Sequence, residues 1–141
     1  RKITDASIPV MGHIGLQPQS VNMTGGYRVQ GKNAKDAQRI IEEAKILEQA
    51  GVFALVVELV VEEVARKVSE SVSVPVIGIG AGRFTDGQVL VINDMLGADR
   101  SYQRKYLKKY ADIEGVILGA LDEYSSDVKD KKFPSEENSF I

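Results

Sequence analysis

The chain repeats one pattern: a short, continuously apolar segment is followed by a longer segment in which apolar residues have helical spacing. The apolar segments are "SIPVMGHIG" (7–15), "VFALVVEL" (52–59) and "VPVIGIGAG" (74–82). Runs without polar alternation are typical of strands buried on both faces, as in parallel sheets. Strands that alternate with helices predict βαβ units with right-handed connections. The pattern therefore predicts an α/β fold with a parallel sheet.

Two amphipathic helices are expected between these strands. In "NAKDAQRIIEEAKILEQAG" (33–51) and "VVEEVARKVSESV" (60–72), apolar residues recur at i, i+3, i+4 and i+7. Gly51 is well placed to end the first helix. Pro75, near the start of the third strand, lies where a missing N–H does least harm.

The last third of the chain is predicted to be mostly helical. A fourth short strand is expected over 89–93, within "DGQVLVINDMLG", and helices over 101–111 and 113–128. The last of these has an apolar stripe at Ile113, Val116, Ile117, Ala120, Leu121 and Tyr124. The polar tail (129–141) is expected to be irregular, and 1–141 as a whole to form a single, partial domain.

Two architectures suit such a sheet: half of a (β/α)8 barrel, or an open doubly wound sheet. The glycine-rich ends of the first and third strands favour the barrel, because barrel sites are built from loops at the carboxyl ends of the strands. Four strands would form only half of a barrel, with two open edges, which are a liability for a chain on its own.

Composition narrows the classes of function. A net charge of −2 gives no electrostatic footprint for nucleic acid or for an anionic membrane. The basic segment 100–109 interleaves cations with tyrosines, but a solvated helix explains it better in an acidic chain. The absence of cysteine excludes disulfides and thiolate metal sites. The longest apolar run, 52–61, is too short to cross a bilayer, which takes about 20 apolar residues. The chain begins without methionine, so Arg1 is expected to lie inside a longer polypeptide.

Three features lie where a barrel would place its site. Glu58 ends the second apolar run, where a carboxylate partly withdrawn from water could act as a general base. His13, the only histidine, follows Gly12 at the end of the first strand. "GIGAG" (78–82) could present backbone N–H groups to an anion.

Each feature also has a purely structural explanation. Glu58 could cap the next helix or pair with a surface arginine, and His13 could be a satisfied core or loop histidine. The glycines could form a tight strand-to-helix turn; they lack the context of a dinucleotide fingerprint, and no Gly-Lys-Ser/Thr follows them. These residue patterns alone leave both explanations open.

The segments "GHIGLQPQSVNMTGGYRVQGK", "LEQAGVFALVVELV", "SVPVIGIGAG" and "DGQVLVINDMLG", in this order, closely resemble the ketopantoate hydroxymethyltransferases. The tail "FPSEENSF" resembles the C-terminal signature of that family. The resemblance implies a (β/α)8 TIM-type barrel, related to phosphoenolpyruvate/pyruvate-binding barrels, of which this chain covers about strands five to eight and the C-terminal helices.

The resemblance also implies an activity in pantothenate biosynthesis. A one-carbon unit would pass from 5,10-methylenetetrahydrofolate to 3-methyl-2-oxobutanoate, giving 2-dehydropantoate, with Mg²⁺ stabilising the enolate. Glu58 matches the proton acceptor of the family, and His13 matches a histidine that lines the 2-oxo-acid pocket. Gly78, Gly80 and Gly82 are expected to shape the pocket. We expect a cytoplasmic homo-oligomer that binds a 2-oxo acid and a folate, and neither nucleic acid nor membrane.

One departure from the family is large. The metal-binding acids of the family, and the lysine and serine that hold the 2-oxo acid, belong to strands one to four, which have no counterpart here. The chain is therefore expected to be inactive without an N-terminal half-barrel, whether that half is continuous with it or a separate chain. Two alternatives stay open: a non-catalytic half-barrel fragment or binding module, and a related 2-oxo-acid lyase of the same superfamily.

Overall fold

A computed structural model describes residues 1–20 and 26–140 of the chain. Contacts divide it into two compact units, Arg1–Val89 and Leu90–Ile141, and each is described below by itself. Residues 21–25, which belong to the first of the family-like segments, lie outside the described residues.

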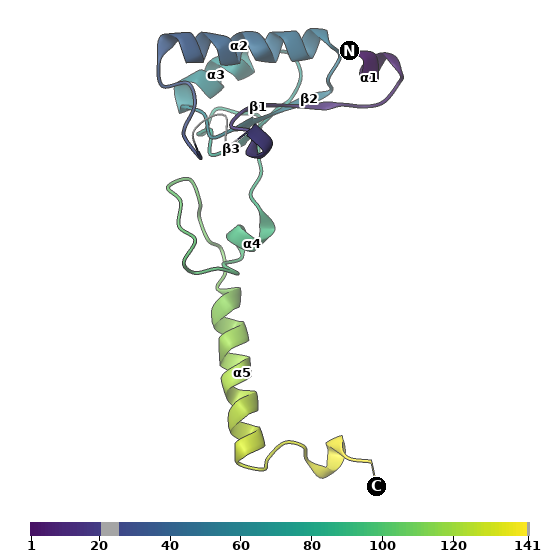
Figure 1. The fold of residues 1–141 in the computed structure, drawn as a ribbon, viewed down its shortest axis with the longest axis vertical. Helices are drawn as coiled ribbons and strands as arrows, with labels where there is room; N and C mark the ends of the chain where they lie inside the picture. Colours follow the sequence, from purple (N-terminus) through teal and green to yellow (C-terminus); the bar gives the residue numbers. More distant parts are fainter. Residues whose placement is uncertain (21–25, 141) are drawn as a thin grey trace. The chain divides into compact units, whose positions relative to one another are not determined.

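The first unit is built on a four-stranded parallel sheet in the order β1-β2-β3-β4. Figure 1 labels the first three of these strands. The strands are β1 (Met11–Gly15), β2 (Ala54–Glu58), β3 (Val76–Ile79) and the very short β4 (Gly87–Gln88). The register sets His13 opposite Val56, and Gly15 opposite Glu58, which in turn faces Ile79 of β3. The predicted α/β fold with a parallel sheet is confirmed.

Helices α2 (Ala34–Gln49) and α3 (Glu62–Ser71) lie on the same side of this sheet (Figure 1). The carboxamide of Asn33 accepts a hydrogen bond from the Asp36 N–H and so caps the start of α2. Gly51 follows the α2 C-cap with a φ of 92°, as predicted for a glycine that ends a helix. The short helix α1 (Lys2–Asp5) precedes the sheet, and the 3₁₀ helix η1 (Pro18–Ser20) follows β1.

The core lies between the sheet and these two helices. It contains, among the described residues, Ile14, Ile40, Ala44, Val52, Leu55, Val57, Val60, Val64, Ala65, Val68, Val76 and Ala81. Because side chains alternate along a strand, Leu55 and Val57 face the helices while Val56 and Glu58 face the other side. On β1, an ideal Cβ at Gly12 would contact Leu47 of α2, so His13 faces the same side of the sheet as Glu58.

The predicted fourth strand is present, but it lies at Gly87–Gln88 and not at the predicted 89–93. The sheet pairing stops at Gln88, after which the Val89 N–H donates to the Gly78 carbonyl, and α4 (Ile92–Met95) begins three residues later. The apolar run "VLVI" does not by itself distinguish a strand from a short helix. Asp94, which directly follows the predicted strand, lies inside α4.

The predicted helix at 101–111 is also wrong, because this segment is an irregular loop. In a helix, cations four residues apart, such as Arg104 and Lys108, would repel one another. In the loop, the Arg100 guanidinium pairs instead with Asp112, and the Lys109 ammonium donates to the Asp99 and Arg100 carbonyls at 2.6 and 3.1 Å. Arg104 lies over the Tyr102 ring, 4.6 Å from its centroid.

The remainder of the second unit is α5 (Ile113–Lys129) and a mostly irregular tail with one 3₁₀ turn, η2 (Glu136–Asn138). Helix α5 matches the predicted segment, and its apolar stripe is largely exposed, with Val116 at 72%. Phe133 of the tail packs edge-on against Tyr124. Within the described ranges, no helix has the length and apolar character needed to cross a membrane.

Candidate functional site

The candidate site lies at the carboxyl ends of β1 and β2. Glu58 is the last residue of β2, and its side chain is 20% exposed. The preceding residues Ala54–Val57 form the apolar centre of the sheet. Their burial fixes the position of β2, and thereby the position of the Glu58 carboxylate at its end. Glu58 is thus a half-buried acid at the edge of an apolar surface, as expected for a group that works outside bulk water.

His13 lies next to Glu58, although 45 positions separate the two in the sequence. Its Nε2 atom is 3.1 Å from Glu58 Oε2, and its side chain is 31% exposed. The atom Nε2 is itself shielded from solvent and has no aligned hydrogen-bond partner among the described residues. The contact is therefore a close approach without the direction of a hydrogen bond, and small movements of either side chain can open or align it.

The position of His13 within the strand differs in one respect from the prediction. His13 is the third of the five residues of β1, and Gly15 is the last. Gly15 has a φ of 86°, and an ideal Cβ there would overlap the Glu58 carbonyl oxygen and lie 2.6 Å from Val60 Cγ2. The absence of a side chain lets β1 come close to the end of β2, where the Leu16 N–H donates to the Glu58 carbonyl at 2.8 Å.

The glycine segment begins at Gly78 inside β3, and Gly82 lies beside Glu62 at the start of α3. Gly80 and Gly82 have φ values of 62° and 83°, and an ideal Cβ at Gly82 would overlap the Glu62 side chain. The Glu62 carboxylate accepts hydrogen bonds from the Arg83 backbone N–H at 3.0 Å and from its guanidinium at 2.9 Å. The Arg83 guanidinium lowers the pKa of the Glu62 carboxyl. The backbone N–H that follows the glycines, that of Arg83, is therefore already bonded to the Glu62 carboxylate of the same chain. The pocket-shaping role of Gly78, Gly80 and Gly82 stays a prediction.

A cavity of about 420 Å³ adjoins His13 on the side away from β2. His13, Gly15 and Gln17 line it from β1 and the segment after it, and Arg39, Glu43 and Leu47 line it from α2. Glu58 is not among its lining residues. The cavity therefore borders the free edge of the sheet, and the face on which His13 meets Glu58 lies outside it.

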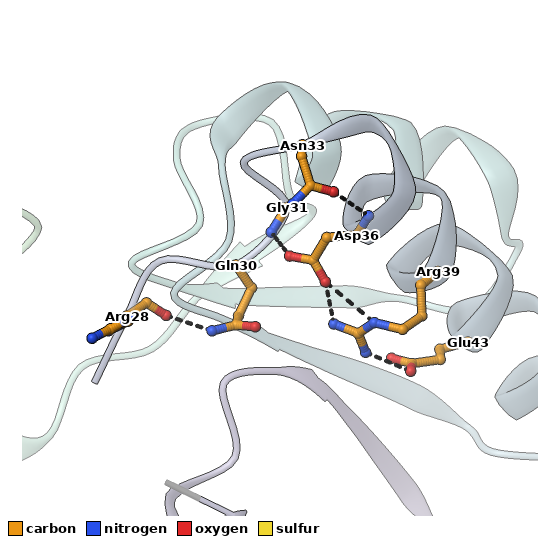
Figure 2. Close-up of polar contacts among 7 residues, drawn as sticks. All are labelled: Arg28, Gln30, Gly31, Asn33, Asp36, Arg39 and Glu43. Carbon is orange, nitrogen blue, oxygen red and sulfur yellow. Dashed lines mark hydrogen bonds and ion pairs between the residues drawn. The ribbon is translucent and has the colours of Figure 1, made fainter. Parts of the chain in front are cut away.

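Polar contacts hold the loop before α2 against the helix (Figure 2). Figure 2 shows the Asp36 carboxylate between the Gly31 N–H and the Arg39 guanidinium, which also reaches Glu43 at 2.6 Å. The hydrogen bonds from Arg39, and next that from Gly31, lower the pKa of the Asp36 carboxyl. This network fixes one wall of the cavity, since Arg39 and Glu43 both line it.

The described residues include no group of three or more histidine and acidic side chains that could hold a metal ion. His13 and Glu58 provide two donor side chains at the candidate site. Mg²⁺ demands octahedral coordination by oxygen, usually from carboxylates and water. The residues present do not fit a Mg²⁺ site by themselves.

The sequence pattern did not single out two residues beside Glu58, which are Gly15 and Leu59. Gly15 could have been found from its place at the end of the "GHIG" segment, although the sequence does not say what approaches it. Leu59 follows Glu58 with a φ of 51°, in the left-handed region. A leucine carries no sequence signal for that conformation.

Comparisons with known proteins show the family of the chain. The family model described as ketopantoate hydroxymethyltransferase matches residues 1–136. The 3-methyl-2-oxobutanoate hydroxymethyltransferase of Pseudothermotoga lettingae is 55% identical over 99% of this chain and 52% of its own length. The enzymes of the same name from Kosmotoga olearia and Thermotoga maritima are 54% and 55% identical, each again over 52% of its own length. The chain spans about half the length of the curated relatives that it matches. It belongs to the ketopantoate hydroxymethyltransferase family.

Proposed function

We propose that this chain supplies the C-terminal half of a ketopantoate hydroxymethyltransferase, corresponding to strands five to eight of a (β/α)8 barrel. The enzyme would transfer a one-carbon unit from 5,10-methylenetetrahydrofolate to 3-methyl-2-oxobutanoate in pantothenate biosynthesis. The observation that carries the proposal is the close approach of Glu58 Oε2 and His13 Nε2, 3.1 Å apart on the open face of a parallel sheet.

Glu58 is the proton acceptor in this proposal. Its carboxylate takes the proton from C3 of the 2-oxo acid, and the electron pair of that C–H bond moves into the enolate. The enolate carbon and a water oxygen bond to the methylene carbon while both of its C–N bonds to the folate break. Tetrahydrofolate leaves with two protons on its nitrogen atoms, one taken from C3 through Glu58 and one from the water. A positioned general base contributes roughly 10²–10⁴-fold to such a step.

His13 would orient the 2-oxo acid beside this base. The shielded Nε2 atom has no aligned partner among the described residues, so a small movement of the His13 or Glu58 side chain would let it bind an oxygen atom of the substrate. The ligands for Mg²⁺ would come from strands one to four, which lie outside this chain.

The free edge of β1 is evidence for a partner that provides strands one to four of the barrel. β1 is the first strand in the order of the sheet, and on its paired side the Val10 carbonyl accepts the Phe53 N–H. In a parallel ladder alternate residues point to opposite sides, so the peptide groups of Met11, His13 and Gly15 face the free edge. There the His13 carbonyl accepts a hydrogen bond from the Gln17 side chain at 2.8 Å, where a neighbouring strand would donate an N–H. A homo-oligomer of the completed barrels is also expected, since the apolar stripe of α5 is exposed.

The test uses the 141-residue chain combined with the N-terminal half of the Thermotoga maritima relative. Deuterium incorporation at C3 of 3-methyl-2-oxobutanoate in D₂O, followed by proton NMR without the folate, reports proton abstraction alone. Glu58→Gln should slow this exchange at least about 100-fold. Glu123→Gln, an exposed carboxylate of α5, should leave it unchanged. His13→Gln should raise KM more than it lowers kcat.

Two outcomes would contradict the proposal. Exchange that survives Glu58→Gln would remove Glu58 from the proton transfer. Full turnover by the 141-residue chain without the other half would remove the need for a partner. A complex that binds the 2-oxo acid without exchanging its C3 proton would favour the non-catalytic binding module.

A further inference from the structure

Leu59, directly after the proposed base, has a backbone conformation that leucine rarely adopts. Its φ of 51° lies in the left-handed region, where the side chain crowds the following carbonyl. Among the described residues, Ser7 and Lys131 are the other non-glycine residues with positive φ, and neither adjoins a strand of the sheet. Such conformations persist where the surrounding structure enforces them, and they gather at functional sites.

Hydrogen bonds from two directions hold this peptide segment. The Leu59 N–H donates to the Ile79 carbonyl of β3 at 2.9 Å. On the other side, the Leu59 carbonyl accepts the Gln30 N–H at 2.8 Å. The next turn is fixed as well, because the Val61 N–H donates to the Gln30 carbonyl at 3.1 Å. The segment after Glu58 is thus tied both to β3 and to the loop before α2.

The left-handed conformation of Leu59 changes the side of the sheet that the next side chain faces. In a straight strand, Val60 would face the same side as Glu58, because they are two positions apart. Val60 instead belongs to the core beneath the helices together with Val57, three positions earlier, and is 2% exposed. Leu59 therefore ends the strand alternation at Glu58, which is left as the last side chain on the open face.

We propose that Leu59 is a positioning residue for Glu58. Its left-handed backbone turns the chain out of the strand directly after Glu58, so that Val60 is anchored in the core and holds the end of β2, where the Glu58 carboxylate lies beside His13 Nε2. An extended backbone at position 59 would carry Val60 out of the core and release this anchor, which would displace the Glu58 side chain from His13. The catalytic consequence rests on the function proposed above, whereas the geometric claim does not.

The test compares three substitutions that separate backbone from side chain. Leu59→Asn and Leu59→Gly favour the left-handed conformation, whereas Leu59→Val opposes it, because a β-branched residue there is an outlier. In the reconstituted complex, Leu59→Val should lower kcat for C3 proton exchange at least about tenfold, with KM little changed, as loss of base alignment predicts. Leu59→Asn and Leu59→Gly should stay within about threefold of the parent chain, because both keep the backbone conformation. If all three lose kcat alike, the side chain rather than the backbone matters, and the inference is overturned.

A spectroscopic measurement keeps the test valid should Leu59→Val fold poorly. With isotopic labels on this chain alone, the single histidine gives one set of imidazole signals. Nuclear Overhauser contacts between that ring and the Glu58 γ protons should persist in Leu59→Asn and Leu59→Gly. Their loss in both variants would refute the positioning role. Exchange that is abolished by Glu58→Gln but unchanged across the Leu59 series would refute this inference alone; exchange indifferent to Glu58→Gln would refute the proposed function instead.

Discussion

Replacing Gly15 by alanine should destabilise the chain more than any other single methyl group added at the site. The new Cβ would overlap the Glu58 carbonyl oxygen and lie 2.6 Å from Val60 Cγ2. The oxygen belongs to the backbone and accepts the Leu16 N–H, so it cannot rotate away. The end of β1 would have to move away from β2.

The expected loss in the free energy of unfolding has two parts. A left-handed backbone costs a non-glycine residue about 1–2 kcal/mol. The overlap adds about 1–3 kcal/mol, as overpacking a core does. The expected loss in the free energy of unfolding is therefore about 2–5 kcal/mol, a large share of the roughly 5–15 kcal/mol of an ordinary domain.

Urea unfolding followed by far-UV circular dichroism measures this loss. With a slope of about 1–3 kcal/mol per molar, the midpoint should fall by about 1 M or more. Gly26→Ala is the matched control, because Gly26 has a φ of 106° but an ideal Cβ there meets no atom of the described residues within 4 Å. Gly26→Ala should lose only the free energy that a left-handed backbone costs a non-glycine residue. Equal midpoints for the two variants would refute the claim that close packing against Glu58 constrains Gly15.

Three further predictions concern the helices. Asn33→Ala should cost about 1 kcal/mol in urea unfolding through loss of the α2 cap, and an unchanged midpoint would contradict that role. Arg39 lowers the pKa of the Asp36 carboxyl, so the contribution of this ion pair to stability is complete above the ordinary pKa of 3.8 and is lost as pH falls through the lowered pKa. Asp36→Asn should therefore flatten the fall of the melting temperature below about pH 4. Gly119→Ala should stabilise α5 by about 0.5–1 kcal/mol, because an ideal Cβ at this position meets no atom within 4 Å in the part of the chain that the structure describes. Gly115→Ala, whose Cβ would overlap Arg100 and Asp112, should not; an equal gain would contradict the argument.

Much of the first unit could be predicted because its sequence pattern and its packing agree. The runs that became β1, β2 and β3 are apolar because both faces of a parallel strand avoid water. Glu58 was recognisable as the one acid at the end of such a run. Its distance from His13 was not, because that depends on the register between β1 and β2, which neither strand encodes alone.

The errors lie where local pattern and tertiary contacts disagree. Helical spacing in 101–111 is outweighed by repulsion among its cations and by the hydrogen bonds that Lys109 makes to the loop backbone. The segment 89–93 is apolar enough for a strand, but the sheet pairing ends at Gln88. The conformation of Leu59 is imposed by Ile79 and Gln30, which are remote in sequence, so no local pattern could reveal it.

The backbone and the side chain of Glu58 have separate roles. Its carbonyl secures the end of the sheet through the Leu16 N–H, while its carboxylate points toward His13. Every amino acid except proline offers the same peptide group, so the backbone hydrogen bond at position 58 does not depend on which side chain that residue has. Position 58 is therefore a natural site for reprogramming: a library of side chains there would sample new reactivity on an unchanged scaffold.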